Sequence, residues 1–138
     1  MACETQQVEA LSASDVYAYA PLTATVPGVA YFTLTNQGST ALTVREYSSD
    51  CFEQAELHSS VMDDGVMEMR PVKMLRIEPA SSVTLRPGGL HLMLINASAA
   101  IKPGNNCRIA VLYGADKRLD FEVTLLDRST YRPAEPVM

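Results

Sequence analysis

Short segments in which apolar and polar residues alternate, separated by turn-forming residues, constrain this chain more than any other feature. In residues 30–35, the apolar Ala, Phe and Leu alternate with Tyr and Thr, and Asn-Gln-Gly at 36–38 then predicts a turn. Comparable segments lie at 42–45, 55–58, 83–85, 90–95, 109–111 and 121–125. Alternation with a period of two is typical of half-buried strands, and no helical period is sustained. The pattern predicts an all-β sandwich or barrel.

The chain has 138 residues, a length that suits a single domain. We expect the folded domain to span residues 8–128, with flexible ends at 1–7 and 129–138. Pro133 and Pro136 disfavour a strand in the C-terminal segment, because proline has no backbone N–H to donate. No apolar run approaches the ~20 residues of a membrane-spanning helix, so no transmembrane segment is expected.

The charge pattern and the missing motifs exclude several classes of function. The formal net charge is -5, and the sequence has no cluster of Lys and Arg of the kind that nucleic-acid binding requires. It has no Gly-rich phosphate loop and no nucleophile elbow. We therefore predict that the chain does not bind nucleic acid and is not an enzyme.

The three cysteines give information on the cellular compartment in which the protein is found. Cys51 and Cys107 are far apart in sequence and could form one disulfide between strands, which would indicate an exported protein. The alternative is two free, buried thiols. Cys3 would then be left over, and its Ala-Cys context resembles the processed end of a bacterial lipoprotein. A lipid anchor at Cys3 and a remnant of a fused segment both remain open.

Both histidines of the chain lie beside methionines at strand spacing. His91 and Met93 are two residues apart, so on a strand they share a face, which we expect to point away from the core. His58 is expected to point outward in the same way, beside a glutamate, Glu56, that either orients its ring or is simply solvated. A turn at 63–65, Asp-Asp-Gly, predicts a hairpin that brings Met69 back toward His58.

This combination of donors selects a particular metal. Thioether sulfur is a soft, uncharged donor, and together with imidazole it favours Cu(I), whereas zinc sites use Cys, His and carboxylate. A blue-copper site would need a cysteine ligand, which the motif lacks. We therefore predict one Cu(I) site, and its four ligands are His58, Met69, His91 and Met93. Met67 and Met62 are possible auxiliary donors, although methionine more often fills apolar space.

The spacing of the four residues, H-x10-M-x21-H-x-M, resembles that of the periplasmic copper chaperone family PCuAC. The segments ELH at 56–58, VMEMRPV at 66–72 and PGGLHLML at 87–94 resemble the family as well, and the similarity runs from about residue 14 to 126. One departure is Ser59, where the family often has Met. The resemblance implies a cupredoxin-like barrel with a solvent-accessible Cu(I) site. It also implies a partner, either the CuA subunit of cytochrome c oxidase or another periplasmic copper carrier.

Three functions remain open at this point. The first is an extracytoplasmic Cu(I) metallochaperone that delivers copper to the CuA site of cytochrome c oxidase by ligand exchange. The second is a periplasmic protein of copper buffering or resistance that has no dedicated oxidase acceptor. The third is a metal-free interaction module built on a β-sandwich.

Overall fold

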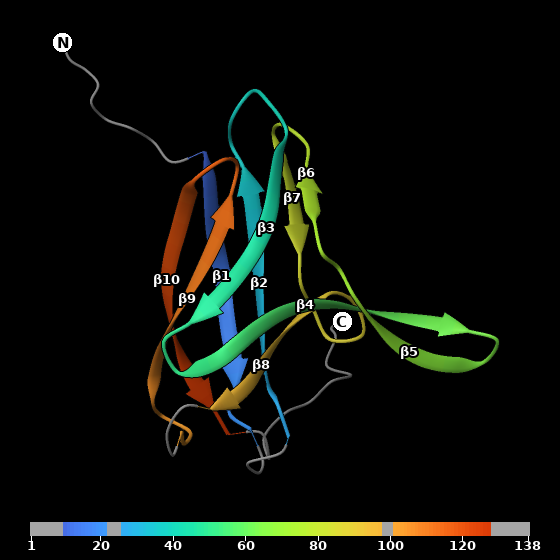
Figure 1. Cartoon of the computed structure of the whole chain (residues 1–138), viewed down its shortest axis with the longest axis vertical. Coiled ribbons are helices and arrows are strands. Elements are labelled where there is room, and N and C mark those ends of the chain that lie inside the picture. Colours follow the sequence, from blue (N-terminus) through green and yellow to red (C-terminus); the bar gives the residue numbers. More distant parts are fainter. Residues whose placement is uncertain (1–9, 22–25, 98–100, 128–138) are drawn as a thin grey trace.

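The computed structural model describes residues 10–21, 26–97 and 101–127, and in these ranges the chain forms ten strands and no helix (Figure 1). The strands are β1 Leu11–Tyr19, β2 Gly28–Asn36, β3 Leu42–Ser49, β4 Phe52–Asp63, β5 Val66–Pro71, β6 Leu75–Ile77, β7 Ser81–Thr84, β8 His91–Ala97, β9 Asn106–Tyr113 and β10 Lys117–Leu126. The described part therefore includes no helix of the length and apolarity that crossing a membrane requires. The expected flexible ends, 1–7 and 129–138, lie outside the described residues.

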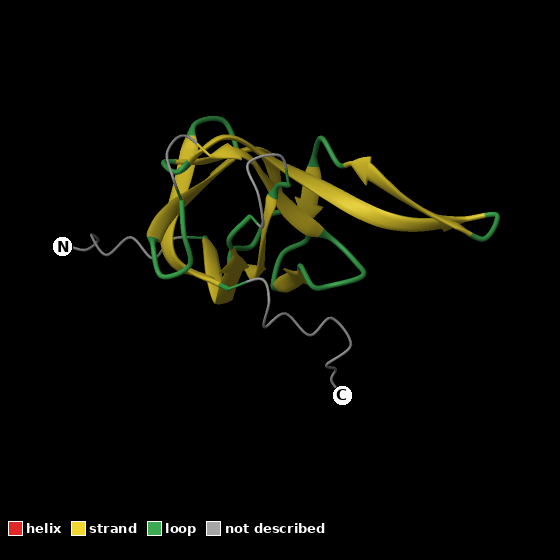
Figure 2. Cartoon of the chain, turned by 90° about the horizontal axis from the view of Figure 1, so that it is seen from below, coloured by secondary structure: helices red, strands yellow, loops and turns green. Residues whose placement is uncertain are grey.

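Seven of the strands close into a barrel. Their order is β4-β8-β2-β1-β10-β9-β3, and the pairing of Tyr47 in β3 with Ala55 in β4 completes the ring. Strands β5, β6 and β7 extend this ring by pairing with β4, β3 and β2. Figure 2 looks along the barrel and shows the β4–β5 hairpin projecting well away from it. The all-β, cupredoxin-like fold expected from the sequence is confirmed.

The interior of the barrel holds the apolar residues that the alternating pattern predicted to point inward. Ala55 and Leu57 of β4 are buried, and so are the leucines of β8 at positions 92 and 94. Phe32, Leu34, Val111 and Tyr113 belong to the same buried cluster. The inward faces of β4 and β8 are therefore fixed by burial in the core. Their outward faces are not needed for core packing and can carry functional side chains.

The first strand, β1, escaped the sequence pattern. It pairs with β2 along most of its length, but the register shifts between Ser14 and Tyr17. Asp15, inside this irregularity, has a positive φ of 52°. A bulge of this kind adds a residue to one strand and so breaks the period of two on which the prediction depends.

A disulfide between Cys51 and Cys107 fastens the start of β4 to β9. The turn that precedes β4 is tied to β9 by two further contacts, since the Arg108 amide donates to the Asp50 carboxylate (2.8 Å) and the Asp50 amide donates to the Arg108 carbonyl (3.3 Å). The strand that bears His58 is therefore anchored at its root by one covalent and two polar contacts.

Removal of this disulfide should lower the stability of the barrel. The two cysteines are 56 residues apart, and a cross-link over a loop of that length contributes about 4 kcal/mol by the loop-entropy relation. We expect a Cys51→Ser, Cys107→Ser variant to lose roughly that much unfolding free energy in urea titrations. The control is the wild-type protein treated with reductant, which should unfold at the same urea concentration as the variant. A variant as stable as the oxidised wild type would contradict the prediction.

Candidate metal centre

The antiparallel register between β4 and β8 places the two histidines directly opposite each other. His58 pairs with His91, and Glu56 pairs with Met93, so all four side chains lie on one face of this strand pair. The centroids of the two imidazole rings are 6.0 Å apart. Two residues that are 33 positions apart in the sequence thus become neighbours through strand pairing alone.

Met69 reaches the same face through the β4–β5 hairpin. Asp64 and Gly65 both have positive φ, 56° and 83°, as a two-residue type I′ turn requires. The turn sets a register in which Met69 pairs with Ser60, two residues beyond His58 on the same side of β4. The hairpin predicted from the Asp-Asp-Gly signal is therefore present, and it carries Met69 toward the histidines.

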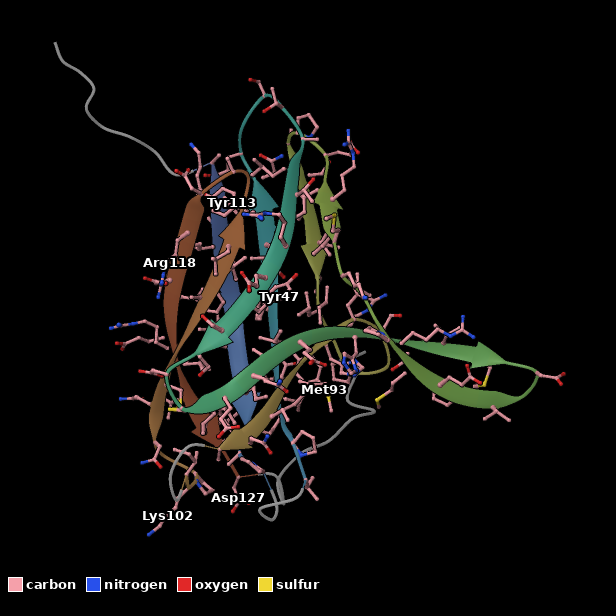
Figure 3. The ribbon with its side chains drawn as sticks, in the orientation of Figure 1. Tyr47, Met93, Lys102, Tyr113, Arg118 and Asp127 are labelled. Atoms are coloured by element: carbon pink, nitrogen blue, oxygen red, sulfur yellow. A yellow bond between two sulfur atoms is a disulfide. The ribbon has the colours of Figure 1, made fainter. Side chains whose placement is uncertain are left out.

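Three of the four expected ligands line a common pocket. Met69, His91 and Met93 contribute to a cavity of about 220 Å³ together with Ser60 and residues near the start of β2. Met93, labelled in Figure 3, lies beside β4 close to the point where the hairpin leaves the barrel. His58 is not part of the lining, but its ring contacts that of His91 at the pocket.

Each imidazole has one nitrogen held by an oxygen and one nitrogen without a partner. The Nδ1 of His91 lies 3.0 Å from the Gly89 carbonyl, and the Nε2 of His58 lies 3.1 Å from a carboxylate oxygen of Glu56. Both oxygens accept, so in the neutral rings these nitrogens are the donors. The opposite nitrogens, Nε2 of His91 and Nδ1 of His58, are buried with no hydrogen-bond partner. A buried acceptor without a partner is costly, and a ring fixed through its other nitrogen is the usual arrangement of a metal ligand.

The exposure of the four residues differs from the expectation that all of them point to solvent. His91 is only 5% exposed, although it lies on the outer face; it lines the cavity together with residues near the start of β2 and with Gly88. The side chain of His58 is 18% exposed, whereas Met69 is 57% exposed. Exposure to solvent within the four expected ligands therefore increases from the buried imidazole of His91 to the exposed thioether of Met69.

The two proposed auxiliary donors lie farther along the hairpin. Met62 pairs with Met67, one rung beyond the Ser60–Met69 pair, and neither contributes to the pocket. Glu56, which the sequence left as either a ring-orienting group or a solvated one, contacts His58. The contact between the Gly89 carbonyl and His91 was not predicted, because every residue has a backbone carbonyl. The only related signal in the sequence is the Gly-Gly turn before His91.

Other clusters in the described ranges do not offer a competing metal site. Asp50, Cys51 and Cys107 lie close enough to share an ion, but the two sulfurs are joined in the disulfide. A larger pocket of about 520 Å³ opens where β3 and β4 diverge, and its lining includes neither His nor Met. Tyr47 lines it, and burial raises the pKa of its hydroxyl. Both histidines and the methionines at 62, 67, 69 and 93 lie on β4, β5 and β8, whereas Met74 lies outside these strands.

Comparison with known proteins agrees with this architecture. Residues 11–123 match the family model described as "Putative lipoprotein LpqE-like", and the chain belongs to this LpqE-like family. No curated protein sequence matches the chain.

Several solved structures share the fold. The copper-bound PCuAC domain from PmoF2 superposes with a TM-score of 0.70 at 16% identity, over 88% of this chain and 96% of that domain. The solution structure of apo-DR1885 from Deinococcus radiodurans gives 0.62 at 19%, over 96% and 92% of the two chains. The structure of CuI-DR1885 from the same organism gives 0.61 at 23%, over 86% and 81%. The expected resemblance to PCuAC domains is therefore confirmed for the fold.

The hydrogen bonds of the two rings predict opposite tautomers in the metal-free protein. At about pH 8, where imidazole is ordinarily neutral, His58 should carry its proton on Nε2 and His91 on Nδ1, because Glu56 and the Gly89 carbonyl accept from those atoms. Long-range proton–nitrogen correlation spectra distinguish the two forms. A Glu56→Ala variant should alter the His58 pattern and leave His91 unchanged. The same tautomer at both histidines would contradict the assignment.

Proposed function

We propose that this chain binds one Cu(I) ion through His58, Met69, His91 and Met93. The observation that carries the proposal is the pair of buried imidazole nitrogens, Nδ1 of His58 and Nε2 of His91, which lack a partner on the face shared with Met69 and Met93. Two imidazoles and two thioethers form a neutral, soft donor set that prefers Cu(I) to harder ions. The PCuAC domain from PmoF2, which has the same fold, is copper-bound in its solved structure, and this supports the choice of copper.

Within this proposal, the protein acts as a carrier and not as an enzyme. A donor set without thiolate leaves the site with the positive charge of the ion, so that an incoming ligand can compete for it. Met69 is the exposed donor, at 57% exposure, while His91 is buried beside it. An acceptor would therefore meet the ion from the Met69 side and displace the thioether first. The acceptor we propose is the CuA subunit of cytochrome c oxidase or another copper carrier that serves it.

The proposed location is outside the cytoplasm, in the periplasm or an equivalent compartment. A disulfide between Cys51 and Cys107 persists in oxidising compartments, and the description of the family is that of a lipoprotein. Thioether ligands suit such a compartment because, unlike thiols, they are not lost to disulfide formation. Cys3, the possible lipid anchor, lies outside the described residues.

Anaerobic titration with Cu(I) against a coloured chelator tests the site. The wild-type protein should hold one equivalent, and a Met69→Ala, His91→Ala variant should lose it, because the variant removes two of the donors that line the pocket. A Met74→Ala variant is the matched control, since Met74 is exposed to a similar extent, at 66% against 57% for Met69, but lies outside the site. Equal competition by the wild type and the double variant would contradict the proposal and favour a metal-free interaction module.

Deletion of the gene separates delivery from buffering. If the protein supplies the oxidase, cells without it should lose cytochrome c oxidase activity in low copper, and added copper should restore it. Re-expression of the wild type should rescue the activity, whereas the Met69→Ala, His91→Ala variant should not. Copper sensitivity with normal respiration would instead indicate a buffering or resistance protein.

A further inference from the structure

The tip of the β4–β5 hairpin carries a second pair of thioethers that the Cu(I) site does not use. Met62 and Met67 are directly opposite each other in the register of β4 and β5. Residues paired in this way have Cβ atoms about 4.5–5.5 Å apart, so two flexible methionine side chains can bring their sulfurs to one ion. Both are largely exposed, Met62 at 62% and Met67 at 54%. Thioether side chains held in water at such a position call for a reason, because their apolar area is left unburied.

This pair lies on the same face of the hairpin as the Cu(I) ligands. On β4, residues 58, 60 and 62 share a face by the strand period, and on β5 residues 67 and 69 share it. The Ser60–Met69 pair and the Met62–Met67 pair are therefore successive rungs of one face. A rung is about 7 Å along a strand, so the second pair lies one step beyond Met69 and toward the tip.

The opposite face of the hairpin has a different chemistry. Glu68 and Arg70 alternate with the methionines, and their side chains form an ion pair of 2.9 Å with each other. The hard carboxylate is thus engaged with a guanidinium on the other face. The face that continues from Met69 carries the thioethers, which select a soft monovalent ion and not Ca²⁺, Mg²⁺ or Zn²⁺.

We infer that Met62 and Met67 form a second, weaker Cu(I) site, through which the ion passes between the His58–His91 site and a partner. The inference depends on the proposed function, because it takes the same ion as its cargo. Cu(I) remains Cu(I) throughout. As the sulfurs of Met62 and Met67 bind the ion, its bonds to the two imidazole nitrogens and to the sulfurs of Met69 and Met93 break, and no electron or proton is transferred. Figures 1 and 2 show the hairpin projecting from the barrel, so the second pair is presented where a partner protein can approach without contacting the barrel.

The test is a Cu(I) titration of the oxidised, full-length protein with methyl-labelled methionine, followed by carbon–proton NMR. The first equivalent should shift the Met69 and Met93 methyl signals, and further Cu(I) should shift those of Met62 and Met67. A Met62→Leu, Met67→Leu variant keeps the apolar volume without sulfur. It should keep the first equivalent, bind no further Cu(I), and release Cu(I) more slowly to a bicinchoninate chelator.

The Met74→Leu variant is the control, because Met74 is exposed to a similar extent but has no methionine opposite it. The inference is overturned if Met62 and Met67 shift no more than Met74 does, or if the double variant binds as many equivalents of Cu(I) and releases them as fast as the wild type. Failure of the proposed function gives a different result, namely that Met69 and Met93 do not respond to the first equivalent. Circular dichroism of the two variants checks that the barrel is folded, and substitutions at exposed positions are not expected to disturb it.

Discussion

The register between β4 and β8 is the constraint on which the candidate site depends. Leu57 pairs with Leu92 on the inner face, and the next pair along, His58 with His91, lies on the outer face. Because side chains alternate with a period of two, a slip of one residue would move the leucines to solvent and the histidines into the core. Burial of the leucines therefore fixes the position of the imidazoles. The disulfide at the root of β4 supports the same register by holding the start of the strand against β9.

The ligands contributed by β8 are more tightly constrained than the ligand contributed by β5. His91 and Met93 belong to β8, which pairs with both β4 and β2 inside the barrel. Met69 belongs to β5, whose only strand partner among the described residues is β4, and all six residues of β5 are exposed. An isolated two-stranded hairpin has little stability of its own. One hydrogen bond at the base of the hairpin, from the Val72 amide to the Leu57 carbonyl (2.8 Å), joins the chain after β5 to the barrel strand β4.

This inequality has a physical consequence for a carrier. A rigid, buried imidazole restricts which ion fits, because its ring cannot turn away from the Gly89 carbonyl without losing a hydrogen bond. An exposed thioether can leave the ion at low cost, because its residue is in contact with water both before and after it releases the ion. Selection of the ion thus depends on β8, and its release depends on β5. The Met62–Met67 pair lies farther out along the hairpin that carries the releasing thioether.

The sequence alone determined the fold class, the position of the β4–β5 turn and the identity of the soft donors. It could do so because the period of two, the Asp64-Gly65 signal and the His and Met residue types are local properties. It missed β1, because the bulge at Asp15 interrupts the alternation, and it predicted an exposed His91 that proved to be buried. Only the tertiary structure decided these points, together with the Gly89 contact and the separation of Met62 and Met67 from the pocket. They depend on strand pairing and on coverage by distant segments, for which a single sequence carries no periodic signal.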